Sequence, residues 1–359
     1  MKNKLSMQKQ WLNVVSKPRI VKTGIAVFLT AWLCQLLEWP VIFAVISAIV
    51  SVEPTVHASI RKGIVRLPAA AIGAFFAMFF NFVLADSPLT YSISAVLTIY
   101  VCHLLRWHQA LVVATLTAVN MIEIVEGQWF IDFLVRLGTT SIGIIVSTCI
   151  NFLIFPPNFT KPIVAQCAKL NMDTKNLLDK VMDYHLYRKG NLQALRKLSD
   201  SNFKLIEKTY ELIRFQKEEY RYRHVHKNDL KMIYQCGHQL DDFEKINHHI
   251  ADMMFFSSRN QEWDQSELES LEHIRTMIVE VFRSGHVQET EFQQCFSTLI
   301  ALLHHHMNQS SADHIEPVAS LTFELLAICV VLRKKQTELK KNEDDEQSSR
   351  VPEATREDR

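Results

Sequence analysis

The pattern of apolar and polar residues changes at about residue 160. From Ile20 to Phe155 the apolar runs are long and charged residues are sparse, whereas from Lys161 onward nearly every helical turn carries Lys, Glu, Asp or Arg. Long apolar runs are typical of membrane spans, and apolar residues at steps of three and four are typical of soluble amphipathic helices. We therefore expect an all-α protein with a basic N-terminus at 1–19, a transmembrane domain at 20–157 and a helical domain at 161–338.

The first part contains apolar runs that predict six transmembrane helices. The third and the sixth run are each about 33 Å long at 1.5 Å per residue, enough to cross the hydrocarbon core of a bilayer, whereas the second and the fifth are shorter. The six runs are 20–37, 41–52, 64–85, 89–105, 109–122 and 133–155.

These runs form an internal repeat. The stretch VRLPAAAIGAFFAMFFNF, residues 65–82, returns as VRLGTTSIGIIVSTCINF, residues 135–152, seventy positions later. Upstream, a block at 29–39 with Leu-Thr, Cys, Leu-Leu and Trp returns at 97–107. Two dense matches in the same order indicate a duplicated unit, at about 20–85 and 89–155. Each unit has three spans, so we expect the copies to be inverted in the membrane.

Basic residues predict the orientation. Lys and Arg precede the first span and lie between spans two and three and spans four and five, whereas the alternate loops carry only acidic charges. By the positive-inside rule, we expect a multi-pass cell-membrane protein whose N-terminus and C-terminal domain are both cytoplasmic.

Two acidic and two basic residues form the candidate polar centre. Glu53 and Glu123 end the two short helices, and Arg66 and Arg136 lie near the starts of the two long ones. Short helices at corresponding places in inverted repeats indicate a binding site. Two interpretations stay open. In the first, each arginine pairs with its glutamate as a structural tie, or the arginines snorkel to the membrane interface. In the second, an arginine binds an anionic substrate while a glutamate carries the coupling proton.

Further residues repeat on the long helices. Asn81 and Asn151 are candidate substrate or ion contacts, and the alternative is that they make hydrogen bonds between helices. Gly73 and Gly143 lie on faces of small residues, which predicts close helix packing.

The arginine-leucine-x4-isoleucine-glycine helix, the duplicated three-span unit, Pro156-Pro157 and the helical C-terminal part together carry a family resemblance. The chain resembles the aromatic acid exporter family, which is related to fusaric acid resistance proteins, and in particular its single-module members from Firmicutes. The resemblance implies efflux of aromatic carboxylates driven by the proton gradient. Larger relatives join two such modules, which implies a homodimer or higher homo-oligomer here.

The second part predicts an antiparallel bundle of five or six helices. Ser266 with Glu269, and Asp313 with Glu316, have the spacing of capping boxes. The basic and aromatic run at 217–227 contains acidic residues, so we expect a solvated helix end and no nucleic-acid partner. The tail at 340–359 lacks apolar residues apart from Val351 and one alanine, and we expect it to be disordered.

No nucleophile elbow, phosphate-binding loop or strand pattern occurs, so we expect neither an enzyme nor a cofactor. The many histidines of the second part lack a ligand pair at helical spacing, so we expect no metal site, although a metal or pH-sensing site across helices stays open. The prediction is therefore a proton-coupled exporter of small aromatic or organic anions. The alternative is a membrane-anchored sensor or scaffold whose cytoplasmic bundle binds a ligand or partner.

Overall fold

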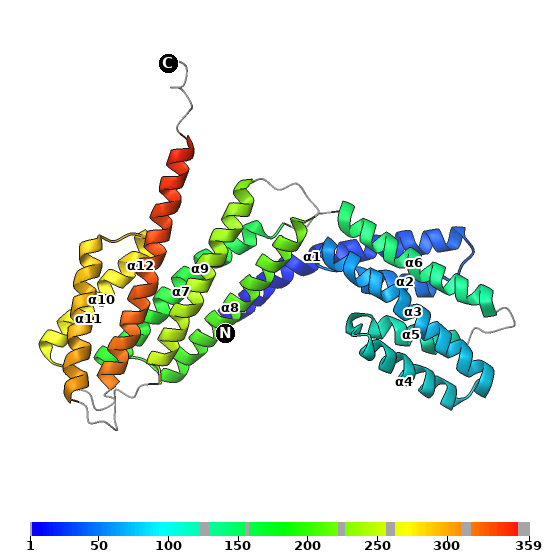
Figure 1. Ribbon diagram of the computed structural model, residues 1–359, viewed down its shortest axis with the longest axis horizontal. Helices are drawn as coiled ribbons and strands as arrows, with labels where there is room; N and C mark the ends of the chain where they lie inside the picture. The colour runs from blue at the N-terminus through cyan, green and yellow to red at the C-terminus, as the bar shows by residue number, and fades with distance from the viewer. Residues whose placement is uncertain are drawn as a thin grey trace, which may run out of the picture. The chain divides into compact units, whose positions relative to one another are not determined.

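The computed structural model describes residues 2–122, 129–154, 158–221, 227–255, 263–309 and 317–350, with side chains between 19 and 337 except at 129, 227, 228, 308, 309 and 317. Every regular element in these ranges is helical (Figure 1). The chain divides into two compact units. The first contains Met1–Phe159 and Arg214–Val225, and the second contains Thr160–Ile213 and His226–Arg359.

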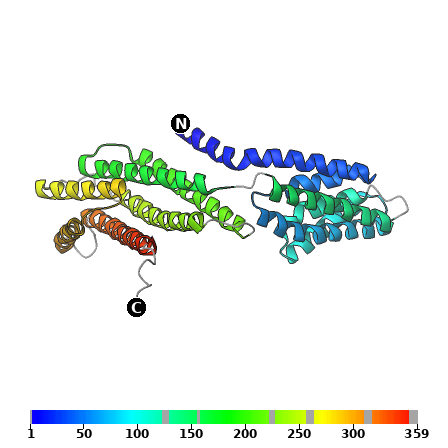
Figure 2. The same cartoon turned by 90° about the horizontal axis from the view of Figure 1, so that it is seen from above.

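In the described part of the first unit, six apolar helices lie where the sequence predicts six spans. They run side by side in Figure 2, and three of them, at Arg19–Leu36, Val56–Leu84 and Phe130–Leu153, are long and apolar enough to cross a membrane. The other three are shorter apolar helices. The helices are α1 (Lys2–Leu36), α2 (Val41–Ser51), α3 (Val56–Leu84), α4 (Pro88–Leu104), α5 (Leu111–Ile122), which follows the 3₁₀ turn η1 (His108–Ala110), and α6 (Trp129–Leu153).

Two of these helices begin earlier than the apolar runs predict. The helix α1 includes the basic segment that we expected to be separate, and α3 begins at Val56 and not near residue 64. The cause at α3 is a helix cap, because the Thr55 side chain accepts a hydrogen bond from the backbone N–H of Ala58 at 3.1 Å. Hydropathy locates the apolar part of a helix and is insensitive to its polar first turns.

The repeated Cys-x-Leu-Leu-x-Trp block encodes the same helix end twice. The N–H of Trp39 donates to the carbonyl of Cys34 at 2.9 Å, and the N–H of Trp107 donates to that of Cys102 at 2.8 Å. The residues before the tryptophans, Glu38 and Arg106, have φ values of 55° and 58°. A left-handed residue followed by this long backward bond is the Schellman ending of a helix, formed here without glycine.

The helices of the two copies pair in the same way with partners exchanged. The helix α3 packs on α5 and α4, α6 packs on α2 and α1, and α3 and α6 contact each other. A Cβ atom added at Gly73 would lie 2.3 Å from the carbonyl oxygen of Ala114, and one at Gly143 would lie 2.3 Å from that of Ala44. These alanines are themselves seventy positions apart, so one close helix contact is made twice.

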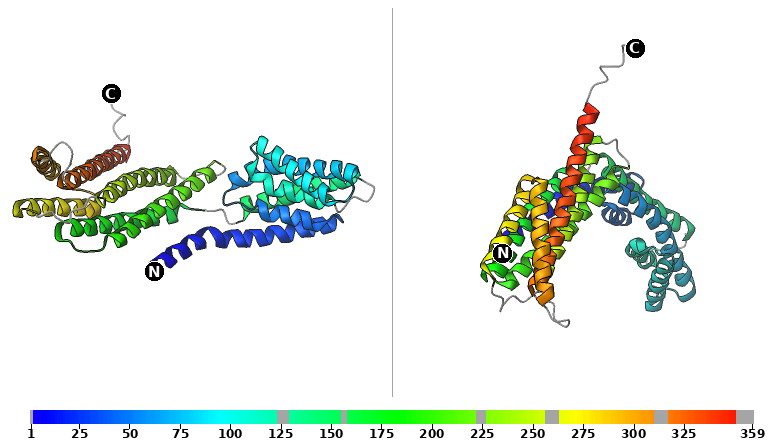
Figure 3. Two further views of the ribbon diagram at one scale, coloured as in Figure 1. Left: turned by 90° about the horizontal axis from the view of Figure 1, so that it is seen from below. Right: turned by 60° about the vertical axis from the view of Figure 1, so that its left-hand side comes forward.

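The second unit contains amphipathic helices, as the sequence predicts. α7 packs on α9 and α10, and α12 packs on α9 and α11; the α11–α12 pair is visible in Figure 3. The helices are α7 (Thr160–Tyr187), α8 (Leu192–Glu219), whose last turn belongs to the first unit, α9 (Lys227–Met253), α10 (Gln265–Ser284), α11 (Glu289–Gln309) and α12 (Pro317–Arg350).

Local details of this unit differ from the prediction. The capping box of α10 is formed by Asp264 and Glu267, and the predicted cap Ser266 donates to the Asp264 carboxylate at 2.9 Å. An aspartate is as good a cap as a serine, so spacing alone chose the wrong residue. The second predicted box, at Asp313 and Glu316, lies outside the described residues. The helix α12 continues to Arg350, past the start of the expected disordered tail, because a charged helix needs no buried face to be helical.

Candidate functional site

The connection between α2 and α3 carries a buried ion cluster. Glu53 is 8% exposed, and its two carboxylate oxygens accept hydrogen bonds from Arg66 Nη2 and Lys62 Nζ, both at 2.9 Å. Lys62 and Arg66 lie one helical turn apart on α3, so both point to the residue that precedes its first turn. The structure thus forms the predicted contact between Arg66 and Glu53 and adds Lys62 as a second cation.

Asn151 of α6 holds the same connection. Its side-chain amide donates to the carbonyl oxygens of Glu53 and Thr55 and to the hydroxyl of Ser59, at 2.9 to 3.1 Å. Its carbonyl oxygen accepts from Lys22 Nζ of α1 at 2.7 Å, and Lys22 is buried. These are hydrogen bonds between helices, as in the alternative interpretation of the sequence. Lys22 was missed as a site residue, although a lysine inside an apolar run was the available signal.

The last turn of α8 lies against the start of α3. The Glu219 carboxylate accepts from the backbone N–H of Val56, and the Glu218 carboxylate accepts from the Thr55 hydroxyl, both at 2.7 Å. The first N–H groups of a helix lack partners within the helix and carry partial positive charge, so carboxylates stabilise them. The prediction of a solvated helix end at 217–227 is therefore wrong for Glu219, which is 1% exposed. The residue that it contacts belongs to a distant segment, which spacing does not reveal.

Arg136 of α6 has a different environment. It is 6% exposed, its Nη2 donates to the Thr117 hydroxyl of α5 at 3.2 Å, and its guanidinium carbon lies 3.4 Å from the ring centroid of Phe43 of α2. Among the described residues no carboxylate pairs with it. Its predicted partner, Glu123, lies outside them. The Nε and Nη1 atoms have no hydrogen-bond partner there, as is also true of Arg66.

The remaining predicted residues lie at helix contacts. The side-chain amide of Asn81 donates to the carbonyl oxygen of Ile122, at the end of α5, at 3.4 Å. Gly73 and Gly143 lie against the backbones of α5 and α2. Asn81 therefore contacts the end of a short helix of the other copy, and Asn151 contacts the connection that follows the other short helix. Arg66 and Arg136 contact different partners. The sequence did not indicate that Phe43 and Thr117 would contact Arg136, because both look like ordinary residues of apolar helices.

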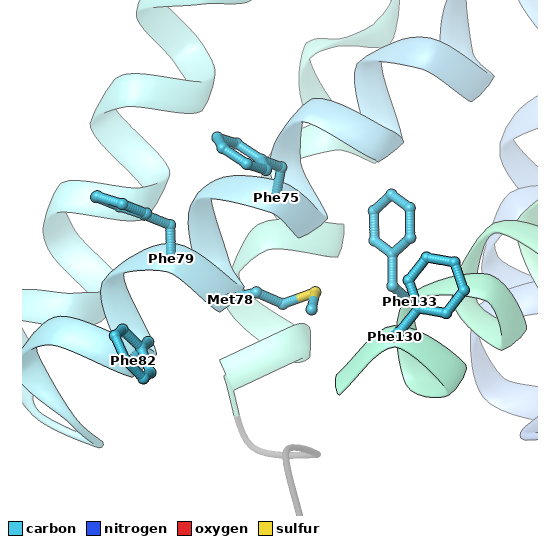
Figure 4. Close-up of a pocket in the computed structure, with 6 residues that line it drawn as sticks. All are labelled: Phe75, Met78, Phe79, Phe82, Phe130 and Phe133. Atoms are coloured by element: carbon cyan, nitrogen blue, oxygen red, sulfur yellow. The ribbon is translucent and has the colours of Figure 1, made fainter. Parts of the chain in front are cut away.

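Two pockets lie along α3 and α6. The first, of about 430 Å³, is apolar, and in Figure 4 Met78 of α3 points toward the phenylalanines of α6. Its lining residues are Phe75, Met78, Phe79, Phe82, Phe130 and Phe133. The second, of about 490 Å³, is lined by small and aliphatic residues, namely Ser59, Ile60, Gly63, Ile64, Leu67, Ser141, Ile144, Ile145, Thr148 and Cys149.

The two pockets are the same place in the two copies. Phe75, Met78 and Phe79 of the first correspond, seventy positions on, to Ile145, Thr148 and Cys149 of the second. Phe133 lies one helical turn before Arg136 on α6, so the aromatic pocket adjoins the helix that carries this arginine.

The second unit holds a buried histidine. His185 is 3% exposed, and its Nε2 lies 2.9 Å from the carbonyl oxygen of Met253, to which it donates. Burial lowers the pKa of His185, and the bond to the carbonyl partly opposes this. A histidine whose pKa is lowered by folding favours the folded state above its unfolded pKa, and this stabilisation is lost as the pH falls through that value.

Comparison with known proteins identifies the family. Residues 16–154 match the family described as "Aromatic acid exporter family member 1". A UPF0421 protein from Bacillus cereus is 36% identical over 321 residues, which cover 88% of this chain and 84% of the relative. The chain belongs to the UPF0421 proteins. Another member, from Bacillus thuringiensis, is 34% identical over 360 residues, or 97% of this chain and 99% of its own.

A UPF0421 protein from Staphylococcus epidermidis is 30% identical over 329 residues, which cover 91% of this chain and 98% of the relative. The similarity to UPF0421 proteins therefore includes both units, whereas the exporter match lies in the first unit alone. The family and the apolar helices together confirm the expectation of a membrane protein of a transport family, and the resemblance drawn from the repeated helix is confirmed.

Proposed function

We propose that this UPF0421 protein exports small aromatic or organic anions across the cell membrane, coupled to protons, and that Arg136 binds the anion. The observation that carries the proposal is a buried guanidinium without a carboxylate among the described residues. A cation inside a membrane costs at least a few kcal/mol unless a partner or a wet cavity accommodates it. Arg66, the equivalent residue, has such a partner in Glu53.

The surroundings of Arg136 suit an aromatic carboxylate. A guanidinium fork binds carboxylates through charge-assisted hydrogen bonds. Two nitrogens of Arg136 have no hydrogen-bond partner among the described residues, and its guanidinium lies over the Phe43 ring. The neighbouring pocket offers phenylalanine rings, against which an aromatic ring packs favourably. Because Glu53 already binds two cations, we assign the coupling proton to Glu123, the residue seventy positions further on.

The proposal includes an inverted three-helix repeat and a cytoplasmic C-terminal unit. The exchanged pairing of α3 with α5 and of α6 with α2 supports the repeat. Glu218 and Glu219 contact the start of α3, which supports placing the α2–α3 connection and the end of α8 on the same side of the membrane. Lys and Arg in that connection favour the cytoplasm. A homodimer or higher homo-oligomer is also proposed, since larger relatives join two modules.

Flux through proteoliposomes tests the proposal. Purified protein should release radiolabelled hydroxybenzoate faster when a pH gradient is imposed, and Arg136→Gln should lower this rate at least about tenfold, since one charge-assisted contact is lost. Arg61→Gln, which removes an exposed arginine of the same unit, is the matched control and should keep the rate. Unchanged flux in folded Arg136→Gln would reject the assignment of the site.

A sensor or scaffold is the second candidate, and one contact favours it. The last turn of α8 contributes Glu218 and Glu219 to the membrane unit, which links the helices of the C-terminal part to α3. In this case neither Arg136→Gln nor the wild type should show gradient-dependent flux.

A further inference from the structure

Three potential metal ligands converge on one point of the second unit. His249 and Asp252 lie one turn apart on α9, and Glu324 lies on α12, which packs on α9. His249 Nδ1 is 2.7 Å from Glu324 Oε2, and one ligand atom from each of the three residues lies within 4.8 Å of the others. Residues three apart on a helix share a face, so the pair on α9 faces the glutamate without backbone rearrangement.

The charges at this point are unbalanced. Glu324 is 8% exposed, and its one ion-pair partner among the described residues is His249. No lysine or arginine in the described part of the chain pairs with Glu324 or with Asp252. The three side chains are two carboxylates and one imidazole, and one of the carboxylates is buried. A buried carboxylate is costly unless it is paired or coordinates a metal ion.

We propose that His249, Asp252 and Glu324 bind a divalent zinc ion. One imidazole nitrogen and two carboxylate oxygens are ligands that zinc accepts, and three protein ligands leave a position for water. The ion would neutralise the two carboxylates and join α9 to α12. Asp252 is exposed, so its side chain is free to turn toward the ion, while Glu324 and His249 already face each other. The site lies outside the proposed transport site and does not depend on it.

The same unit offers a matched control. His306 Nε2 of α11 lies 2.7 Å from Glu267 Oε1 of α10, the same pair of residue types at the same distance. No third ligand joins this pair among the described residues. Specific zinc binding should therefore depend on Glu324 and not on Glu267, whereas non-specific binding of zinc to histidines would not differ between the two pairs.

The test is zinc binding to the full-length protein, purified in detergent without a histidine tag and stripped with a chelator. We expect calorimetry in the presence of a weak competing chelator to show one tightly bound equivalent, and elemental analysis to recover it after gel filtration. Glu324→Gln and Asp252→Asn should each weaken this binding at least about tenfold. Glu267→Gln should leave it unchanged.

Folding does not confound the result, because Asp252 is exposed and Asp252→Asn keeps the shape of the side chain. Zinc should raise the melting temperature of the wild type and of Glu267→Gln, and should not raise that of Asp252→Asn. Absence of a tight equivalent in the wild type, or equal binding in wild type and Asp252→Asn, would overturn the proposal.

Discussion

The equivalent arginines of the two repeated helices have different partners. Arg66 in the first copy donates to a buried carboxylate, whereas Arg136 in the second stacks on Phe43 and donates to the neutral hydroxyl of Thr117. Both are almost fully buried. The duplication therefore placed two equivalent cations, and different neighbours left one neutralised and the other without a described counter-charge. This difference is the reason for proposing Arg136, and not Arg66, as the anion-binding residue.

The pockets show the same division. The copy that pairs its arginine has phenylalanines and a methionine at the positions where the other copy has isoleucine, threonine and cysteine. Because α3 and α6 both contribute to each pocket, the aromatic one includes the turn of α6 just before Arg136. In the proposed assignment to Arg136, the differences between the two copies locate the site, and the residues that they share do not.

The largest expected effect concerns the close helix contact that both copies make at a glycine. Gly73→Ala and Gly143→Ala should each destabilise the protein by about 3 kcal/mol, since the new Cβ would lie 2.3 Å from a backbone oxygen that cannot move aside. Thermal unfolding in detergent measures this, with Gly24→Ala as control, because nothing lies within 4 Å there. A clear difference between the two variants would show that the close contact is not equivalent in the copies.

Replacing the arginines tests the difference directly. Arg66→Met should cost roughly 2–3 kcal/mol, less than usual for a broken buried pair because Lys62 still binds Glu53. Arg136→Met should be neutral or stabilising, since it removes a buried charge and strands no described carboxylate. Denaturation midpoints in detergent give both values. Equal costs would reveal a hidden partner of Arg136, with Glu123 the first to examine, and would remove the anion site.

Replacing the two repeated asparagines should also lower the stability by different amounts. Asn151→Ala removes bonds to two carbonyls, to Ser59 and to Lys22, and should cost about 2 kcal/mol. Asn81→Ala removes one long bond to Ile122 and should cost less than about 1 kcal/mol. The same unfolding assay compares them, with Asn120→Ala, whose side-chain bond lies within its own helix, as control. Asn81→Ala costing as much as Asn151→Ala would contradict the contrast.

The smallest expected effect concerns the stabilisation of the start of α3 by the carboxylate of Glu219 on α8. Glu219→Gln keeps an acceptor for the Val56 N–H but removes the charge at the start of α3, so local stability should fall by about 0.5–1 kcal/mol. Faster hydrogen exchange in the first turn of α3 would show this. Glu207→Gln, at an exposed place on α8, is the control and should leave exchange unchanged. Equal exchange rates in Glu219→Gln and Glu207→Gln would show that the charge of Glu219 does not stabilise the start of α3.

Much of the fold follows from local pattern. The apolar runs located six helices, and the repeated Cys-x-Leu-Leu-x-Trp block corresponds to one helix end formed twice. The starts of α1 and α3 were missed, because a polar first turn and a threonine cap contribute nothing to hydropathy. The contact of Arg66 with Glu53 was predictable because both flank one connection.

Contacts between distant segments were not predictable. Glu219 meets Val56 across 163 positions, and Glu324 meets His249 across 75. Lys22 pairs with Asn151 across 129 positions. In each case one partner looks like an ordinary charge on a helix, and only packing decides that it is buried.

The sequence by itself determined that this chain is helical, that its first part suits a membrane, that this part is duplicated, and that an arginine, a glycine and an asparagine recur on equivalent helices. These properties depend on the order of residues along one helix or on a comparison of two stretches. Only the tertiary structure decided that Arg66 meets a carboxylate while Arg136 meets an aromatic ring. The partner of a buried charge comes from another helix, and the free energy of that charge depends on the partner and not on its own position in the chain.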